Sequence, residues 1–246
     1  QTVPQCLTGL NGCYIPLRSI YANADYFEAC EVATDLIYHS SSSYYDAHCD
    51  YTQSIPRFGN TIWNQCYLGV MRCNAMYASI ERAPLTEEEK TPLLAECEIL
   101  RAYYYYILTI NFGDVPYYSE PVPSNDKDIQ YKGRDPRTDV MQACMEDFNY
   151  AVANVKANDG VDYVNKYVVA TVASRCMLFE GTWYIYHKND KAMQGYQNVD
   201  GLAKTFLEKA VEYAQVVMDS GVYKFDTEFN KLFGSFSKPG SEILMY

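Results

Sequence analysis

The sequence lacks most of the features that identify an enzyme, a metal protein or a membrane-spanning chain. No run of apolar residues is long enough to cross a bilayer. The nine cysteines form no CxxC pair and the three histidines form no HExxH motif, so the common zinc patterns are missing. The nucleophile elbow G-x-S-x-G, the Walker A loop and the dinucleotide fingerprint G-x-G-x-x-G are missing too. These absences predict a protein that is not an enzyme and uses no cofactor and no metal.

Positive charge is also scarce. The 246 residues include 20 Lys and Arg against 31 Asp and Glu, which gives a formal net charge of -11. Nucleic acids and anionic lipid surfaces bind to clusters of basic side chains, so this balance argues against both as partners. It suits a protein with an uncharged ligand, and the 48% hydrophobic content is enough for a substantial core.

The cysteines are read here as small buried side chains. Nine is an odd number, so they cannot all pair within the chain. Most of them lie in helical segments, where cysteine behaves as a small apolar residue: Cys30, Cys66, Cys73, Cys97, Cys144 and Cys176. A bridge between Cys6 and Cys13 stays open. The chain begins at Gln1 with no signal peptide, and we expect that an upstream segment has been removed.

Apolar residues recur at helical spacing along most of the chain, which predicts an all-α fold. The predicted helices cover residues 7–35, 61–82, 91–113, 138–158, 165–187 and 202–220. Loops are predicted at 38–59, 125–134 and 189–201, and 242–246 resembles the start of a strand.

Helix boundaries carry recognisable signals. Thr86 with Glu89 fits a capping box. Pro92 suits a first helical turn better than a helix interior, which places the start of the main helix at Thr91. Gly113 and Gly221 are predicted to close the helices that precede them, because glycine readily adopts the left-handed conformation.

The later helices resemble one another. Val140, Cys144, Phe148, Ala151 and Val155 align with Ala203, Leu207, Val211, Ala214 and Met218, and small residues at Ala170, Ala173 and Gly181 favour close packing of the helix between them. Such pairs are typical of tetratricopeptide-like stacks. A generic helical bundle is the alternative.

Acidic residues in the loop at 125–134 raise the question of calcium. Asp126 and Asp128 resemble the start of a calcium-binding loop. The glycine is misplaced, however, and Arg137 stands where a bidentate Glu is needed. A solvated loop is therefore the preferred interpretation.

Residues 100–122 read LRAYYYYILTINFGDVPYYSEPV and closely resemble the signature of the SusD/RagB family. In that signature an acidic helix leads to Leu-Arg-Ala, then aromatics, then Phe/Tyr-Gly-x-x-Pro. Further matches to family helices lie at 63–74, 137–155, 165–184 and 207–225, and 241–243 resembles a family strand. The resemblance covers nearly the whole chain, which we treat as one SusD/RagB-like helical domain at 1–246.

The resemblance implies a function. Family members are lipoproteins on the surface of Bacteroidetes cells, held in the outer membrane by an N-terminal lipidated cysteine. They contain tetratricopeptide-like helix pairs, and they pass oligosaccharides or other nutrients to a SusC-like TonB-dependent outer-membrane barrel. The lipid anchor is not present in this chain. The chain also has about half the usual family length, so we expect a C-terminal half to be missing.

The candidate ligand-binding loop is residues 38–60, because family members use this region to contact sugars. Sugars need flat aromatic platforms beside hydrogen-bonding groups. The residues that supply this mixture are Tyr38, His39, Tyr44, Tyr45, Tyr51, Arg57, Asn60 and, with less weight because its helix position is usually packed, Trp63. The alternative is that these residues only fasten the loop to the helices. For the signature residues Arg101, Tyr103–Tyr106, Gly113 and Pro116 we expect structural roles.

A second function stays open at this stage. Tetratricopeptide-like stacks often bind peptides in a concave groove, so an interaction scaffold is the alternative to nutrient capture.

Overall fold

The computed structural model describes residues 1–21, 59–157 and 164–225. In these ranges the backbone is helical apart from connecting segments and one isolated bridge between Val115 and Asp135. The all-α prediction is confirmed. The predicted strand at 242–246 and the second part of the first predicted helix lie outside the described residues. No helix in the described ranges is both long and apolar enough to span a bilayer.

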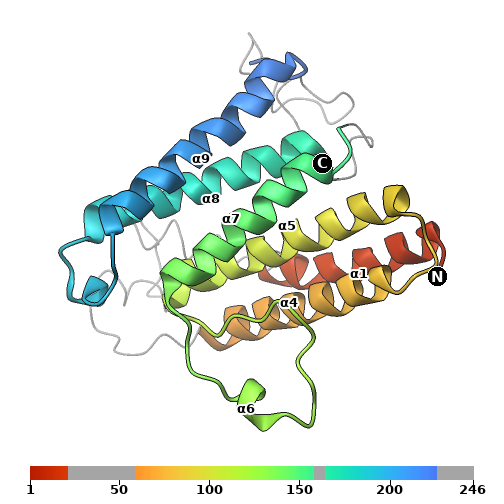
Figure 1. Cartoon of the computed structure of the whole chain (residues 1–246), viewed down its shortest axis with the longest axis horizontal. Helices are drawn as coiled ribbons and strands as arrows, with labels where there is room; N and C mark the ends of the chain where they lie inside the picture. The colour runs from red at the N-terminus through yellow and green to blue at the C-terminus, as the bar shows by residue number, and fades with distance from the viewer. Residues whose placement is uncertain (22–58, 158–163, 226–246) are drawn as a thin grey trace, which may run out of the picture.

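The helices follow one another across the molecule as a stack (Figure 1). They are α1 (Val3–Tyr21), α4 (Gly59–Glu81), α5 (Glu87–Phe112), the short α6 (Lys127–Gln130), α7 (Arg137–Asn154), α8 (Lys166–His187), the 3₁₀ turn η1 (Lys191–Met193) and α9 (Val199–Ser220). Helix α4 packs on α1 and α5, α7 packs on α5 and α8, and α8 packs on α9. This arrangement of neighbouring antiparallel helices is the one expected for stacked helix pairs.

One core cluster runs through the stack from α1 to α9. It includes Cys13, Tyr104, Phe148, Tyr184 and Phe206, none of them more than 1% exposed. The expected role of the cysteines holds for the described ones, which are buried free thiols: Cys6, Cys13, Cys66, Cys73, Cys97, Cys144 and Cys176. Cys6 and Cys13 are not bridged.

The start of α5 corrects the prediction from Pro92. The capping box is present, with Glu89 N donating to Thr86 Oγ1 at 3.3 Å and Thr86 N donating to Glu89 Oε2 at 2.9 Å. The helix begins directly after Thr86, at Glu87, and continues through Pro92. Proline leaves the carbonyl of Glu88 without its helical donor, but Glu88 is exposed and water can satisfy it. The two capping bonds therefore decide the start. At the other end Gly113 caps the helix as predicted, but with φ 69° and ψ −121°, which is outside the left-handed helical region. Gly221 closes α9 in the left-handed conformation, with φ 64° and ψ 5°.

Two predicted loops contain short helical turns. Within 125–134, α6 is capped by Asp126, whose side chain accepts from Ile129 N at 3.1 Å. Within 189–201, η1 precedes the start of α9, which begins at Val199 rather than Leu202. Asp126 is thus occupied in capping, and no cluster of metal-ligating side chains occurs among the described residues.

The close approach of α8 and α9 agrees with the small residues noted in the sequence. Ala170, Ala173 and Gly181 are buried. A Cβ atom added to Gly181 would lie 2.7 Å from Leu207 Cγ and 3.0 Å from the backbone oxygen of Ala203. Only a glycine lets the two helices come this close.

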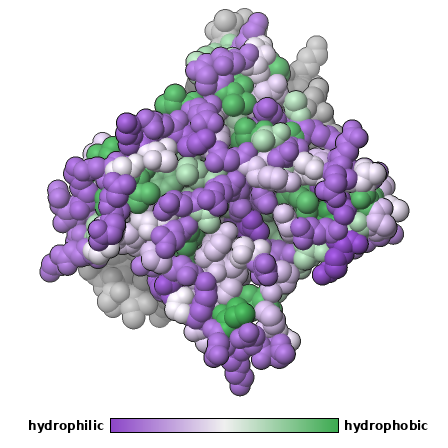
Figure 2. All heavy atoms as spheres, viewed as in Figure 1, coloured by the Kyte–Doolittle hydropathy of each residue, from purple (hydrophilic) through white to green (hydrophobic). Residues whose placement is uncertain are grey.

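The aligned apolar residues of α7 and α9 do not all occupy equivalent buried positions. The four aligned positions in α7 and its C-cap Val155 are buried, but Val211 and Met218 of α9 are 68% and 72% exposed. The buried stripe of α9 is instead Ala203, Phe206, Ala210 and Tyr213. Both stripes are apolar and helically spaced, and the one carrying the two aromatic rings faces the core. In Figure 2, apolar atoms accordingly lie among hydrophilic ones on the surface of α9.

Candidate functional site

The signature arginine has the structural role expected of it. Arg101 is 7% exposed and forms a bidentate ion pair with Asp147 of α7, with N···O distances of 2.9 and 2.6 Å. Its Nη1 donates to Asn74 Oδ1 of α4 at 3.3 Å and to the backbone oxygen of Ser119 at 3.1 Å. One buried cation therefore ties three helices to the segment that follows α5, and it is not free to bind a ligand.

The tyrosine run also serves packing. Tyr104 and Tyr105 are fully buried, and their hydroxyls bond with the backbone of Cys13 and Tyr118. Tyr103 shares a hydrogen bond of 2.6 Å with the hydroxyl of Tyr21. Burial raises the pKa of Tyr105 well above its ordinary value, so it remains a neutral donor and acceptor. The run packs on several sides of α5, as predicted.

The turn after α5 joins the ends of two helices. Arg134 Nη1 donates to the backbone oxygens of Phe112 and Asp114, both at 3.1 Å. Val115 and Asp135 exchange backbone hydrogen bonds of 3.2 and 3.1 Å. Segment 113–136 thus returns to the head of α7 and holds Asp114 beside the first turn of that helix.

Most of the predicted site residues lie outside the described ranges: Tyr38, His39, Tyr44, Tyr45, Tyr51 and Arg57. Asn60 lies in the first turn of α4, and only its backbone is described. Trp63 is half-buried one turn further on, with ring centroids 4.8 Å from Tyr67 and 5.1 Å from Phe112. The guanidinium of Arg134 lies 5.6 Å from the centre of its ring. Trp63 is therefore a partly buried ring that packs against two aromatic rings and a cation.

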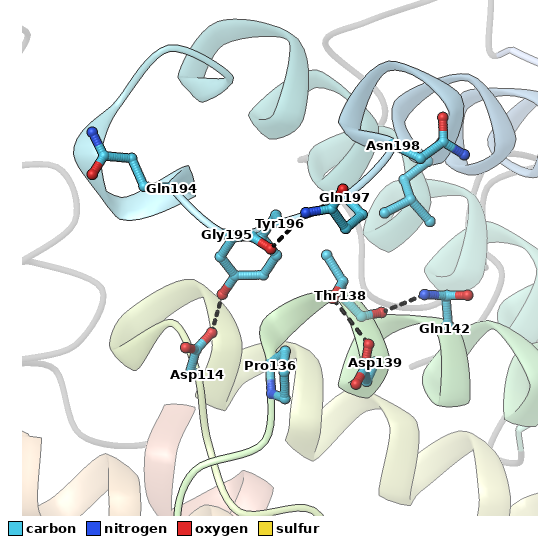
Figure 3. Close-up of a pocket in the computed structure, with 11 residues that line it drawn as sticks. Asp114, Pro136, Thr138, Asp139, Gln142, Gln194, Gly195, Tyr196, Gln197 and Asn198 are labelled. Atoms are coloured by element: carbon cyan, nitrogen blue, oxygen red, sulfur yellow. Dashed lines mark hydrogen bonds between the residues drawn. The ribbon is translucent and has the colours of Figure 1, made fainter.

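A cavity of about 460 Å³ lies between the turn after α5, the first turns of α7 and segment 194–198 (Figure 3). Most of the residues that line it carry polar side chains. Four amide side chains line it: Gln142, Gln194, Gln197 and Asn198. Thr138, the ring of Tyr196 and the carboxylates of Asp114 and Asp139 also contribute. No Lys or Arg belongs to the described lining. Amides both donate and accept hydrogen bonds, so the cavity presents a mixed donor and acceptor surface.

Buried interactions fix the floor of the cavity. The Tyr196 hydroxyl donates to Asp114 Oδ1, which also accepts from the backbone N of Arg137 at 2.8 Å. The Arg137 guanidinium is paired with buried Glu180 of α8 at 2.8 and 2.6 Å and lies 3.8 Å from the ring centre of Trp183. Burial, with the hydrogen bond to Asp114, raises the pKa of Tyr196 to about 12. Tyr196 therefore keeps its proton and its orientation at ordinary pH.

The backbone of segment 194–198 is unusual. Gly195 has φ 105°, and Asn198 is the one non-glycine residue with positive φ in the described ranges, at 52°. Buried Met193 and the hydrogen bond from Tyr196 N to Met193 O, 3.2 Å, hold the segment at its start. Leu202 N bonds to Asn198 O at 3.0 Å and starts α9. The segment is therefore fixed at both ends, and its side chains lie along one wall of the cavity.

The amides keep hydrogen-bonding capacity. Gln142 Nε2 donates to Thr138 O at 3.2 Å, and Gln197 Nε2 donates to Gly195 O at 3.4 Å. Within the described part of the chain, the side chains of Gln194 and Asn198 make no hydrogen bond. Asp139 is exposed, and its Oδ1 accepts from Thr138 Oγ1 at 3.0 Å. The remaining donors and acceptors are available to a hydroxyl-rich ligand.

Sequence reasoning missed this cavity because it treated 189–201 as a plain loop. A signal was present. Within five residues the loop holds Gln194, Gly195, Tyr196, Gln197 and Asn198, the same mixture of ring and amide that drew attention to 38–60. The partner residues at the start of α7 are far away in the sequence, and only the fold brings them together.

Comparison with known proteins gives the family. A family model described as "Starch-binding associating with outer membrane" (SusD-like_3) matches residues 10–178, which includes the signature segment. A curated relative, a SusD-like protein of Formosa agariphila, is 23% identical over 125 residues, which make up 49% of this chain and 23% of the relative.

Solved structures agree on the fold. A SusD superfamily protein from Bacteroides thetaiotaomicron is 18% identical with a TM-score of 0.71, and the match covers 100% of this chain and 52% of that one. A laminarin-binding SusD-like protein is 18% identical with a TM-score of 0.74, and the match covers 98% of this chain and 50% of that one. This chain thus spans about half the length of these two structures. Because the family model matches well over half of its residues, the chain belongs to the SusD-like family of starch-binding, outer-membrane-associated proteins.

Proposed function

We propose that this protein captures oligosaccharides at the outer membrane and passes them to a TonB-dependent outer-membrane transporter, without chemical change to the sugar. The observation that carries the proposal is the SusD-like match over residues 10–178, with a fold that is also that of a laminarin-binding relative. We further propose that the protein is a lipoprotein displayed on the cell surface.

The arrangement of the helices supports a structural role for the helix interiors and a binding role for the loops. The signature residues are committed to buried contacts, as with the Arg101–Asp147 pair and the hydroxyls of Tyr104 and Tyr105. A frame of this kind is rigid and offers its ligand surface through loops and helix ends.

We assign the first sugar contact to segment 38–60 together with Trp63. Helix α4 begins at Gly59, so the segment leads directly into the turn that carries Asn60 and Trp63. The Trp63 ring is supported by Phe112 and Arg134 and keeps part of its surface accessible. A supported and partly accessible ring is a suitable neighbour for the apolar face of a sugar.

The expected affinity is modest. Covering about 60 Å² of a sugar face with an aromatic ring contributes roughly 1.5 kcal/mol before entropy losses. Two such platforms with hydrogen bonds give dissociation constants of the order of micromolar to millimolar. Binding of this strength allows release to a transporter.

A glycan array followed by calorimetry tests the proposal. We expect laminari-, malto- or xylogluco-oligosaccharides to bind the wild-type chain, and the double substitution Tyr44→Ala with Tyr45→Ala to abolish binding while the far-UV spectrum stays helical. Tyr186→Ala is the matched control, because Tyr186 lies on α8 with 80% of its surface exposed. Normal binding by the double variant would refute the loop assignment. Absence of binding to every glycan on the array would refute the function.

Transfer to a transporter needs its own test. Full-length protein carrying its lipid anchor is expected to co-purify with a TonB-dependent barrel from outer membranes and to be accessible to protease on intact cells. Failure to co-purify with such a barrel would refute the transfer step and leave sugar capture standing.

A further inference from the structure

We propose that the cavity between the start of α7 and segment 194–198 is a second saccharide subsite, and that it accepts an uncharged sugar residue and rejects an acidic one. The inference rests on the proposed function, because it assumes that the protein binds oligosaccharides. It concerns described residues outside segment 38–60, so the two sites can be tested separately.

Size and lining fit one or two sugar residues. The volume of about 460 Å³ lies in the range of small-molecule sites. Each sugar hydroxyl both donates and accepts a hydrogen bond, and the amides of Gln142, Gln194 and Asn198 can do the same. The Tyr196 ring adds a flat apolar surface to the wall (Figure 3). An amide-rich wall beside one ring matches the alternation of polar rim and apolar face on a pyranose.

The cavity is built into the fold. Tyr196 is fixed by Asp114, Asp114 is fixed by the backbone N of Arg137, and Arg137 is paired with fully buried Glu180. Asn198 has the left-handed backbone that asparagine tolerates better than most residues, and this conformation turns the chain into the start of α9. The amide of Asn198 therefore stands on a wall whose position three helices determine.

Charge decides which sugars fit. The described lining contains the carboxylates of Asp114 and Asp139 and no Lys or Arg. Asp114 is engaged by Tyr196 and by the first turn of α7, whereas Asp139 is exposed and bonded on one oxygen to Thr138. A uronic acid or a sulfated sugar would bring a second negative charge next to Asp139 without a cation to balance it, and this is unfavourable. A neutral hexose meets no such penalty and can donate its hydroxyls to the carboxylates.

The amides are tested by substituting Asn198→Gly together with Gln194→Ala. Glycine keeps the left-handed backbone at 198, so the change removes amides without straining the segment. We expect the double variant to bind laminari-, malto- or xylogluco-oligosaccharides roughly tenfold more weakly than wild type, since two hydrogen-bonding groups are lost. Asn189→Gly with Gln215→Ala is the matched control, because both residues are exposed and neither lines the cavity. An unchanged dissociation constant in the cavity variant would overturn the subsite.

A direct readout separates this site from the loop. On titration of the wild-type chain with the same oligosaccharides, the side-chain amide resonances of Gln194 and Asn198 are expected to shift in NMR spectra. If the Tyr44→Ala, Tyr45→Ala variant loses binding while the cavity variant binds normally and these resonances stay still, the subsite is wrong and the proposed function stands. If wild type binds no oligosaccharide, the proposed function fails and the subsite fails with it.

The proposed preference for uncharged over acidic sugars, called the charge rule below, is tested by the substitution Asp139→Lys. Wild type is expected to bind oligogalacturonate at least about tenfold more weakly than the neutral oligosaccharides, and the substitution to reverse much of that difference. Asp219→Lys on the exposed part of α9 makes the same change in net charge away from the cavity and is expected to have little effect. Equal binding of acidic and neutral sugars by wild type, or equal gains from the two substitutions, would overturn the charge rule.

Discussion

Single residues with buried charge hold the frame together. Arg101 with Asp147 and Arg137 with Glu180 join α5 to α7 and α7 to α8 through short bidentate contacts. Burial of charge is tolerated because both partners are present, and removing one of them costs several kcal/mol. Glu98 differs from these paired carboxylates. Its carboxylate lies 4.0 Å from Arg101, and Arg101 already forms its short contacts with Asp147.

Glu98 gives the protein a pH dependence. Burial, and then the negative charge of Asp147, raises the pKa of Glu98 to about 7, against the opposing effects of Arg101 and a hydrogen bond with Tyr77. The folded state therefore binds a proton more tightly than the unfolded state does. This contribution to stability is complete below the unfolded pKa, near 4.5, and is lost as pH rises through about 7.

The substitution Glu98→Gln tests this linkage. It removes the titration, so we expect the melting temperature to rise by roughly 2–4 °C at pH 8 and to change little at pH 4, as followed by circular dichroism. Glu120→Gln on an exposed loop is the control and is expected to change neither value. An equal shift of Glu98→Gln at both pH values would contradict the assignment.

At the scale of elements, the neighbours of a helix decide how much of its surface is buried and which residues face the core. Helix α5 lies between α4, α1 and α7, so its buried residues surround most of its circumference. Helix α9 packs mainly on α8, and two of its apolar residues, Val211 and Met218, stay exposed. Ring-bearing Phe206 and Tyr213 point inward, where Tyr213 also donates to Asn149 of α7 at 2.7 Å.

The register of α9 can be measured by comparing two truncations. Phe206→Ala removes a fully buried ring and is expected to lower the free energy of unfolding by about 3–5 kcal/mol in urea denaturation. Val211→Ala, at a position 68% exposed, is expected to change it by less than about 0.5 kcal/mol. A larger loss of unfolding free energy for Val211→Ala than for Phe206→Ala would mean that Val211 faces the core, which contradicts the structure.

At the scale of the whole molecule, the surface is acidic and the proposed ligand is neutral. A net charge of -11 repels anionic polymers in general. The carboxylates of the proposed subsite disfavour anionic sugars locally. Capture then depends on hydrogen bonds and ring contacts, which salt screens very little.

Salt dependence checks this distinction. We expect the dissociation constant of the wild-type chain for neutral oligosaccharides to stay within about twofold between about 0.05 and 0.5 M NaCl, measured by calorimetry. Binding of oligogalacturonate to the Asp139→Lys variant is expected to weaken with salt over the same range. A strong salt dependence for the neutral sugars would contradict capture by hydrogen bonds and ring contacts.

The sequence by itself determined the helices, the capping box at Thr86, the closing glycines and the family, because these depend on local spacing and on an ordered motif that no neighbouring segment can alter. Tertiary structure decided the rest. It chose between two apolar stripes on α9, turned the signature arginine toward Asp147, and brought Asp114, Gln142 and Asn198 from three separate segments to one cavity. The physical reason is that burial, charge pairing and cavity shape depend on which helices become neighbours, and spacing along one chain does not contain that information.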